Sequence, residues 1–317
     1  MVAADSASDV LRLTLAQIRR LDIEMDLAAA RGPDQLKLGV RSATGAAVAG
    51  RHGHLFIGDG ANHWETQHLG RAKVTPDWIA GWRDLFIRRQ AEAARRGVML
   101  WNLIIPEKQV VLPEARWAEP IPDGERRPLK LLLPVLGPEA RLHYAAPALI
   151  AAKPHAPVYF RRNSHWTPSG CCAALFDFLS AIGVSADPER LRFGYVRRRG
   201  PHDLTPHLFE QPAAEDYGAL ASGGVFDFEE RTLPVTGRNT GTRFGIRNPD
   251  APDPRRVIVF GDSFTADAGF AEALSAVFRD VRFLWIKGVS WAEVEACRAD
   301  LVIWESAERF LSSVAQD

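Results

Sequence analysis

A serine stands where an apolar segment ends and a helix-forming segment begins. Val257–Phe260 is apolar throughout, Gly261-Asp262-Ser263-Phe264 follows it, and the residues from 265 onward favour a helix. In α/β folds the carboxyl end of a strand borders the ligand crevice, and a helix that starts there directs free N–H groups at a developing oxyanion. The pattern fits a nucleophilic serine. Its alternative is an ordinary turn in which Ser263 caps the helix, because Gly, Asp and Ser are all common turn residues.

A histidine occupies the matching position in an earlier unit. The segment Asn163-Ser164-His165-Trp166-Thr167-Pro168 lies between a predicted strand at 157–160 and a predicted helix that Thr167 can cap. If both strands are parallel members of one sheet, His165 and Asn163 share an edge with Ser263. His165 could then accept the serine proton, and Asn163 could bind the far ring nitrogen and fix the tautomer. A histidine that only packs or caps is the alternative.

Four further residues are candidates for contacts with substrate or oxyanion. Asp262 directly precedes the serine, and Lys108 follows a strong strand, from which it could face the crevice or form a surface ion pair. Asn239 and Arg247 lie upstream of the serine and could donate to an oxyanion or a sugar hydroxyl, with ordinary loop polarity as the alternative. No Gly-rich phosphate loop and no metal-ligand spacing occurs, so neither a cofactor nor a metal is predicted.

Alternating strands and helices must position these residues. The continuous apolar run 98–105 is typical of a strand buried on both faces of a parallel sheet. The pattern predicts a doubly wound α/β fold with a mostly parallel sheet. We expect a helical extension over 1–32, one domain over 33–317, and a long irregular insertion at about 184–254. The other predicted strands are 54–57, 256–260, 281–286 and 300–304, and the predicted helices are 78–96, 168–183, 265–278, 291–298 and 306–314.

Composition excludes several classes of protein. The 317 residues include 39 basic and 39 acidic side chains, so no excess positive charge favours nucleic acid. No stretch reaches the roughly 18 apolar residues of a membrane-spanning helix. The three cysteines form no disulfide framework or zinc motif and are expected to be buried or half-buried thiols. The first residues lack the pattern of a signal peptide, so a cytoplasmic location is expected, or a periplasmic one if the N-terminus was trimmed.

Together, the serine and histidine segments resemble the SGNH-hydrolase-like domain of the alginate O-acetyltransferase family of bacterial polysaccharide O-acetyltransferases. The resemblance runs in order over about residues 51 to 311. It implies a flavodoxin-like three-layer fold, Ser263 as nucleophile, His165 as base, and an acid at position 163. It also implies acetyl transfer to a carbohydrate hydroxyl from an acetyl donor, including one handed on by another acyltransferase. The supporting segments are Gly53–Ile57 with Asn62, Ile104–Lys108, Asp300–Ile303 and Glu308–Leu311.

The chain departs from this family pattern at one position. The family has an aspartate two residues before the histidine, whereas Asn163 stands here. In a serine protease the corresponding change of aspartate to asparagine lowers turnover by about 10⁴. Three accounts remain open: a weakened enzyme, an engineered replacement, or an acid supplied by Asp203, Asp227 or Asp267. The functional alternatives are a carbohydrate esterase and a catalytically degenerate glycan-binding module.

Overall fold

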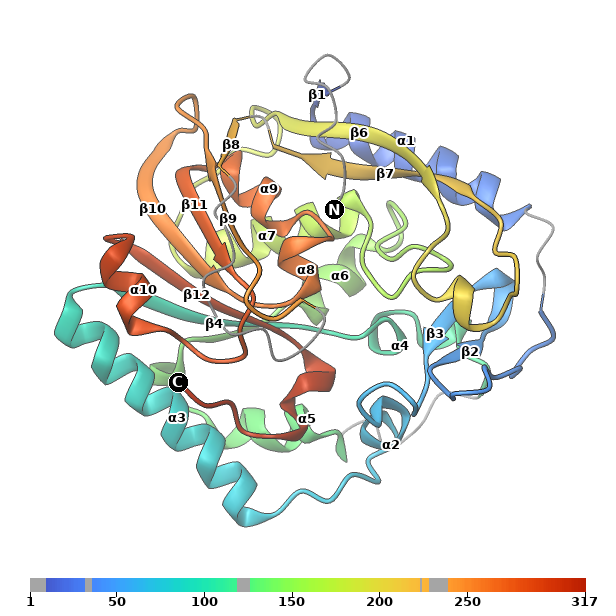
Figure 1. Ribbon diagram of the computed structural model, residues 1–317, viewed down its shortest axis with the longest axis horizontal. Coiled ribbons are helices and arrows are strands. Elements are labelled where there is room, and N and C mark those ends of the chain that lie inside the picture. The colour runs from blue at the N-terminus through green and yellow to red at the C-terminus, as the bar shows by residue number, and fades with distance from the viewer. Residues whose placement is uncertain (1–9, 32–35, 119–125, 223, 228–238) are drawn as a thin grey trace.

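A seven-stranded sheet forms the centre of the protein (Figure 1). The computed structural model describes residues 10–31, 36–118, 126–222, 224–227 and 239–317. The strand order is β5-β4-β12-β10-β11-β9-β8; β5, β4, β12, β10 and β11 are parallel, while β9 runs antiparallel to both of its neighbours. The predicted mostly parallel sheet is therefore confirmed. Its strands are β4 (Met99–Ile105), β5 (Leu142–Tyr144), β8 (Val225–Asp227), β9 (Arg243–Arg247), β10 (Asp253–Phe260), β11 (Phe278–Leu284) and β12 (Leu301–Ala307).

Alternate residues of the central strands enter two separate hydrophobic cores. In β10, Val257 and Val259 belong to one core, and Ile258 and Phe260 belong to the other. A strand buried on both faces needs this continuous apolar character, because its side chains alternate between the faces. The first core also contains residues of α1 (Leu15–Ala30), α6 (Ala146–Ala152), α7 (Pro168–Ala181) and α9 (Phe270–Ser275), and the second contains residues of α3 (Pro76–Arg96), α5 (Pro128–Leu132) and α10 (Trp291–Ala296).

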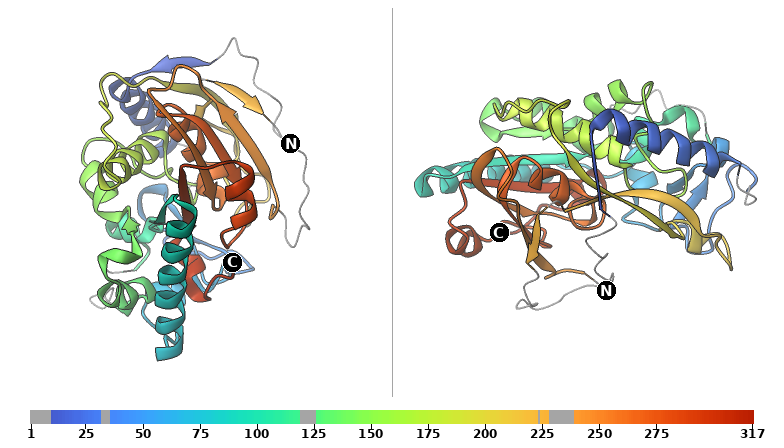
Figure 2. Two further views of the ribbon diagram at one scale, coloured as in Figure 1. Left: turned by 90° about the vertical axis from the view of Figure 1, so that its left-hand side faces the viewer. Right: turned by 90° about the horizontal axis from the view of Figure 1, so that it is seen from above.

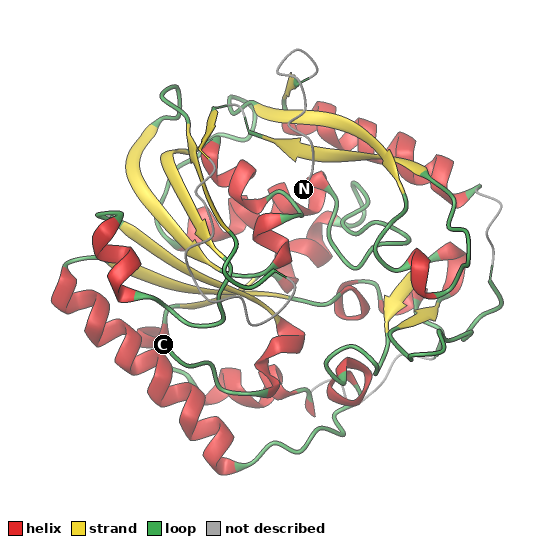
Figure 3. Ribbon diagram, viewed as in Figure 1, coloured by secondary structure: helices red, strands yellow, loops and turns green. Residues whose placement is uncertain are grey.

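The helices thus form layers on both faces of the sheet, as Figure 3 shows by secondary structure. In the right-hand view of Figure 2, α1, α6 and α7 lie together on one side. The doubly wound, three-layer α/β fold expected from the sequence is confirmed. Thr167 caps α7, as the sequence predicts, and Thr75, which was not predicted, caps α3. Each accepts a backbone hydrogen bond at the start of its helix, and a proline follows each of them.

Several element predictions were wrong. Residues 157–160 form no strand of the central sheet, since only an isolated bridge joins Tyr159 to Trp166. The expected helix 265–278 is two short helices, α8 (Ser263–Ala266) and α9, separated at Gly269, whose φ is 85°. The expected closing helix 306–314 begins instead as the last residues of β12 and continues as a 3₁₀ helix at Glu308–Ser312.

The insertion at 184–254 is more ordered than expected. It contributes β6 (Phe193–Gly200) and β7 (Glu215–Ala221), which pair antiparallel with each other, and β1 (Leu11–Leu13) pairs antiparallel with β6. The same insertion supplies β8 and β9 to the central sheet. A second small sheet contains β2 (Ala47–Ala49) and β3 (Leu55–Ile57), with α2 (Trp64–His68) and α4 (Lys108–Val111) as further short helices.

The N-terminal helix packs into the main body of the protein. Leu15, Ile18 and Leu21 of α1 are buried in the first core beside α7. In the described residues no helix is long and apolar enough to cross a membrane. Cys171 and Cys172 are buried free thiols and Cys297 is half-buried, as the sequence predicts.

Candidate active site

Ser263 lies at the carboxyl end of β10, at the edge of the central sheet. Gly261 and Asp262 connect the strand to α8, whose first residue is Ser263. The Asp262 carboxylate accepts hydrogen bonds from the Phe264 N–H at 2.9 Å and from the Ala307 N–H at 2.8 Å. Both carboxylate oxygens of Asp262 are therefore engaged with backbone, and its side chain fixes the serine turn to β12. Asp262 also lines the cavity at this edge of the sheet, so its contact with a substrate stays a prediction.

A buried glutamate that the sequence analysis missed lies beneath this turn. Glu305 of β12 is 2% exposed, and its Oε2 accepts hydrogen bonds from the Asp262 N–H at 3.0 Å and the Thr265 hydroxyl at 2.8 Å. Burial, followed by the neighbouring Asp262 charge, raises the pKa of Glu305 well above its ordinary value. Glu305 thus supports the serine turn. The signal available in the sequence was an acidic residue, Glu305, directly after the apolar segment 301–304.

His165 lies on a hairpin-like loop whose ends are joined by backbone hydrogen bonds. The Phe160 N–H donates to the His165 oxygen at 3.3 Å, and the Thr167 N–H donates to the Val158 oxygen at 3.1 Å. The premise that His165 follows a parallel strand of the same sheet was therefore wrong. The loop nevertheless brings His165 to Ser263, because α7 begins directly after it and packs in the core that also contains Phe264.

The side chains of Ser263, His165 and Asn163 form a hydrogen-bonded series. The Nε2 atom of His165 lies 2.7 Å from the Ser263 Oγ, and its Nδ1 atom lies 2.8 Å from the Asn163 Oδ1. The Asn163 Oδ1 also accepts a hydrogen bond from the His165 backbone N–H at 2.9 Å. Because an amide oxygen only accepts, Nδ1 must carry the proton, which leaves Nε2 free to accept the serine proton. The geometry matches that of a serine–histidine site with asparagine as the orienting group.

The environment of His165 favours the neutral imidazole that a general base requires. Burial lowers the pKa of His165 below 6.5, while the charge of Asp203 acts in the opposite direction. Phe264 covers the ring, with ring centroids 4.8 Å apart. A neutral ring at neutral pH can accept a proton from Ser263.

A carboxylate lies beside the same ring. The Asp203 Oδ2 is 3.5 Å from the His165 Nδ1, and the Ser164 hydroxyl donates a short hydrogen bond to that oxygen. The other oxygen, Oδ1, accepts the Ser164 backbone N–H at 2.8 Å. Of the other two acids considered from sequence, Asp267 follows α8 and donates its N–H to the Ser263 carbonyl at 2.8 Å, whereas the Asp227 side chain lies outside the described part of the structure.

Lys108 is not at the surface of a crevice. It is 1% exposed, and its Nζ donates to the backbone oxygens of Leu55 at 2.8 Å, Phe160 at 2.6 Å, Arg161 at 2.6 Å and Asn163 at 3.3 Å. Neither alternative from the sequence, substrate contact or surface ion pair, fits this position. The amine instead fixes the segment that leads into His165.

The two candidates in the insertion lie at opposite ends of the sheet. Arg247 pairs with Asp280, near the start of β11, and its guanidinium lies 4.0 Å from the Asp280 carboxylate. Ser263 is at the other end of the neighbouring strand, so the structure does not bring Arg247 to the serine. Asn239 lies at the same edge of the sheet as Ser263. The Thr242 N–H donates to the Asn239 oxygen at 3.0 Å, and the Thr242 oxygen accepts from the N–H of Trp285, the residue after the end of β11.

The turn at Ser263 offers few free backbone donors. The Phe264 N–H binds the Asp262 side chain, and the Thr265 and Ala266 N–H groups bind the Asp262 backbone oxygen. The expectation of several free helix N–H groups was therefore wrong, since α8 has four residues and its first turn is already engaged. The Ser263 N–H is the amide of this turn that remains for an oxyanion.

A cavity of about 800 Å³ opens at this edge of the sheet. Its lining includes Gly261 and Asp262, the two residues before the serine, and the half-buried rings of Trp285 and Trp291. Carboxyl ends of parallel strands are the usual ligand position in open α/β sheets. The volume is in the range of cavities that hold small molecules.

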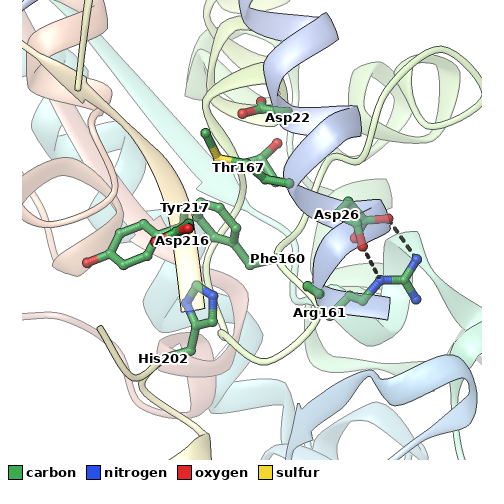
Figure 4. A pocket seen from close by; sticks show the side chains of 10 residues that line it. Asp22, Asp26, Phe160, Arg161, Thr167, His202, Asp216 and Tyr217 are labelled. Carbon is green, nitrogen blue, oxygen red and sulfur yellow. Dashed lines mark hydrogen bonds and ion pairs between the residues drawn. The ribbon is translucent and has the colours of Figure 1, made fainter. Parts of the chain in front are cut away.

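A second cavity lies behind the histidine loop, against α1 (Figure 4). Its volume is about 20 Å³, which is enough for a single water. Asp26 and Arg161 form an ion pair at its rim, 2.7 Å apart, and His202 stacks near Tyr217 with ring centroids 5.0 Å apart. This cavity is too small for a substrate. Among the described residues, no group of three or more His, Cys, Asp or Glu side chains is arranged to hold a metal ion.

These features define a doubly wound α/β protein with a candidate serine–histidine site at the carboxyl edge of its sheet. No family model and no curated protein matches the chain in sequence. Solved structures match in fold. PatB1 of Bacillus cereus has a TM-score of 0.56 at 14% identity, covering 77% of this chain and 93% of that one; PatB1 with a sulfonyl adduct has a TM-score of 0.52.

Two further structures give the same result. The O-acetyltransferase domain of Pseudomonas putida AlgJ has a TM-score of 0.53 at 18% identity, covering 84% of this chain and 92% of that one. A DHHW family protein from Eubacterium siraeum has a TM-score of 0.56 at 13% identity, covering 88% and 96%. At these identities the likeness is one of fold, and at that level the resemblance found in the sequence is confirmed.

Proposed function

We propose that the protein is an O-acetyltransferase that moves an acetyl group to a carbohydrate hydroxyl through an acetyl-Ser263 intermediate. The observation that carries the proposal is the hydrogen-bonded series from the Ser263 Oγ through His165 to the Asn163 Oδ1, at 2.7 Å and 2.8 Å. The likeness in fold to the O-acetyltransferase domain of AlgJ supports the choice of group transferred.

Two half-reactions account for the transfer. Ser263 Oγ attacks the carbonyl carbon of an acetyl donor while its proton passes to the His165 Nε2, and His165 then returns that proton to the leaving group. In the second half, a sugar hydroxyl loses its proton to His165 and attacks the acetyl-serine, and His165 then returns that proton to the Ser263 Oγ as the acetylated sugar is released. Throughout, Asn163 holds the ring in one tautomer. In this proposal the Ser263 N–H donates to the oxyanion that forms in each half.

The large cavity supports a carbohydrate as the acceptor. Trp285 and Trp291 present half-buried rings to it, and Gly261 and Asp262, the two residues before the serine, line the same cavity. Flat aromatic faces beside polar groups suit the alternating apolar and hydroxyl surfaces of a sugar. The donor is a small acetyl ester, including one supplied by another acyltransferase. No nucleic acid is a partner in this proposal.

Two other functions use the same residues. An esterase would hydrolyse the acetyl-serine with water in place of the sugar hydroxyl. A glycan-binding protein without turnover is favoured by one observation, the uncharged Asn163 at the acid position. Fractionation of cells that express the full gene distinguishes a cytoplasmic from a periplasmic location.

The decisive experiment is to incubate the protein with p-nitrophenyl acetate and to map the adduct by mass spectrometry. We expect a burst of p-nitrophenol and a gain of about 42 Da on the Ser263 peptide, since an acetyl group replaces a hydrogen. Ser263→Ala should abolish both, whereas Ser312→Ala, at an exposed position, should behave as the parent.

Adding acetylated or free oligosaccharide separates the alternatives. Acetate transferred to the sugar supports the transferase, and acetate released only to water supports the esterase. Sugar binding that survives Ser263→Ala, with no ester turnover by the parent, would establish the binding protein instead. An adduct on another residue would contradict the assignment of Ser263.

A further inference from the structure

The asparagine at position 163 leaves one task of a catalytic acid unfilled. The acid of a Ser–His–acid triad holds the imidazole in one tautomer and also stabilises the imidazolium by its negative charge. Asn163 performs the first task, because its Oδ1 binds both the backbone N–H and the Nδ1 of His165. A neutral amide has no net charge for the second.

Asp203 supplies a carboxylate at the same ring nitrogen. Its Oδ2 lies 3.5 Å from the His165 Nδ1, which is ion-pair distance, although the direct hydrogen bond of Nδ1 goes to Asn163. The side chain of Asp203 is 37% exposed and that of His165 is 14% exposed. The carboxylate therefore keeps contact with water while it faces a largely buried ring.

The position of Asp203 is fixed by two hydrogen bonds from a single residue. Ser164, between Asn163 and His165 in the chain, donates its backbone N–H to the Asp203 Oδ1 at 2.8 Å and its hydroxyl to the Oδ2. The Ser164 Oγ itself lies 3.3 Å from the His165 Nδ1. Asn163 thus holds the His165 ring while Ser164 holds the Asp203 carboxylate. Because these residues are consecutive in the chain, the position of the charge relative to the ring is fixed.

We propose that Asn163 and Asp203 divide the work of the missing acid, with Asn163 orienting His165 and Asp203 supplying the charge. This inference rests on the proposed function of the site. Asp203 is a positioning residue that acts through His165. The serine proton moves from the Ser263 Oγ to the His165 Nε2, the Nδ1 proton stays on the ring, and no proton passes to Asp203.

A double-mutant cycle tests the division. Asp203→Asn keeps one of the two acceptors for Ser164 and removes the charge, and we expect turnover of p-nitrophenyl acetate to fall by about 10². In the Asp203→Asn background, Asn163→Asp should recover at least about tenfold, since it restores a carboxylate at Nδ1. In the parent, Asn163→Asp should change turnover by less than about threefold, because a charge is already present. Asp187→Asn, at an exposed position in the same insertion, is the matched control and should leave turnover unchanged.

The pH dependence separates charge from mere loop structure. Four charged groups act on the pKa of His165, and Asp203 has the largest effect among them; the others are Arg309, Asp262 and Asp267. Removing its charge should lower the pKa of His165 further, so the acid limb of kcat/KM should move to lower pH in Asp203→Asn. A loop that is only disordered would lose turnover without this shift.

The histidine itself gives a readout that needs no turnover. Titration by ¹H–¹⁵N NMR, with the His165 signal assigned by comparison with His165→Gln, should show a lower pKa in Asp203→Asn than in the parent. An unchanged His165 pKa, or an Asn163→Asp effect of equal size in both backgrounds, would overturn the proposal while leaving acetyl-Ser263 untouched. If the parent forms no acetyl-serine, the proposed function fails and the NMR titration still decides for or against Asp203. Should Asp203→Asn not fold, Asp203→Ser provides the same comparison.

Discussion

The structure makes a strong prediction for the buried lysine beneath the histidine loop. Lys108 is completely enclosed, and four backbone oxygens lie 2.6 to 3.3 Å from its Nζ. Three of these oxygens belong to Phe160, Arg161 and Asn163, in the segment that leads into His165. Four acceptors around one nitrogen suit an ammonium with its three N–H donors. The change Lys108→Met keeps most of the aliphatic chain and removes every donor.

The magnitude follows from the contacts. Each buried carbonyl left without a partner costs about 1 to 3 kcal/mol, so the three bonds shorter than 3 Å represent about 3 to 9 kcal/mol. Burial also lowers the pKa of Lys108, which shows that enclosing the charge has a cost, and Met avoids that cost of several kcal/mol. We therefore expect the free energy of unfolding to fall by about 3 kcal/mol.

Urea unfolding followed by tryptophan fluorescence measures this change. The matched control is Lys153→Met, because the Lys153 Nζ binds one backbone oxygen, that of Val111 at 3.1 Å, and the partly exposed Glu114. For the control we expect a loss below about 1 kcal/mol. Folded Lys108→Met should also turn over p-nitrophenyl acetate at least about tenfold more slowly, because the carbonyl of Asn163 is released. A stability loss equal to that of Lys153→Met would refute the reasoning.

Three further outcomes are expected. Because burial lowers the pKa of His165, the midpoint of the acid limb of kcat/KM should lie below the ordinary histidine value of 6.5; a midpoint at 6.5 or above would contradict this. Burial raises the pKa of Asp22 from 3.8 to about 7, so the folded state binds its proton more tightly and stability should fall as pH rises from about 4 to 7. Asp22→Asn should remove much of that decline, up to about 4 kcal/mol, and unfolding curves across this range would detect it. In Gly261→Ala the new Cβ would lie 2.5 Å from the Glu305 Oε2, so we expect a loss of stability of about 1 to 3 kcal/mol and reduced turnover; Gly200→Ala, with open space around it, should be neutral by thermal unfolding.

The central sheet could be predicted because its signal is local. The segments 98–105 and 256–260 are continuously apolar, and both became central strands whose residues alternate between two cores. The cap at Thr167 likewise predicts the start of α7. In each case the information lies within a few residues, where side-chain character and helix-capping chemistry suffice.

The failures concern features that depend on distant parts of the chain. The segment 157–160 has the residue types of a strand, but it makes only one isolated bridge in the structure. In the sheet, β12 pairs with β4 and β10, so no position beside these strands is left for it. The first residues of β12 are apolar, yet its later residues include Glu305, whose partners Asp262 and Thr265 are some 40 positions earlier. Lys108 was expected either at a crevice or in a surface ion pair, because a sequence does not show the four carbonyl oxygens that enclose it.

The same contrast holds within the candidate site. Ser263 was located from the end of the apolar segment 256–260, and its side chain does meet those of His165 and Asn163, although the strand expected before them does not form. The contact of Asp203 with His165 depends on the path that the insertion takes from α7 through β6 to residue 203. Residue types alone do not fix that path. Asp203 was one of three acids considered, and only geometry distinguishes it.

The neighbours of Asn163 suggest why an amide suits this position. Its Nδ2 lies 3.3 Å from the Nδ1 of His202, and burial lowers the pKa of His202 to about 4, so that ring is neutral at neutral pH. An amide can donate to the neutral ring through Nδ2 while its oxygen accepts from His165. A carboxylate has no N–H to donate to His202, and it would add a second negative charge close to Asp203. The adjacent residues His202 and Asp203 therefore match Asn163 in hydrogen bonding and in charge.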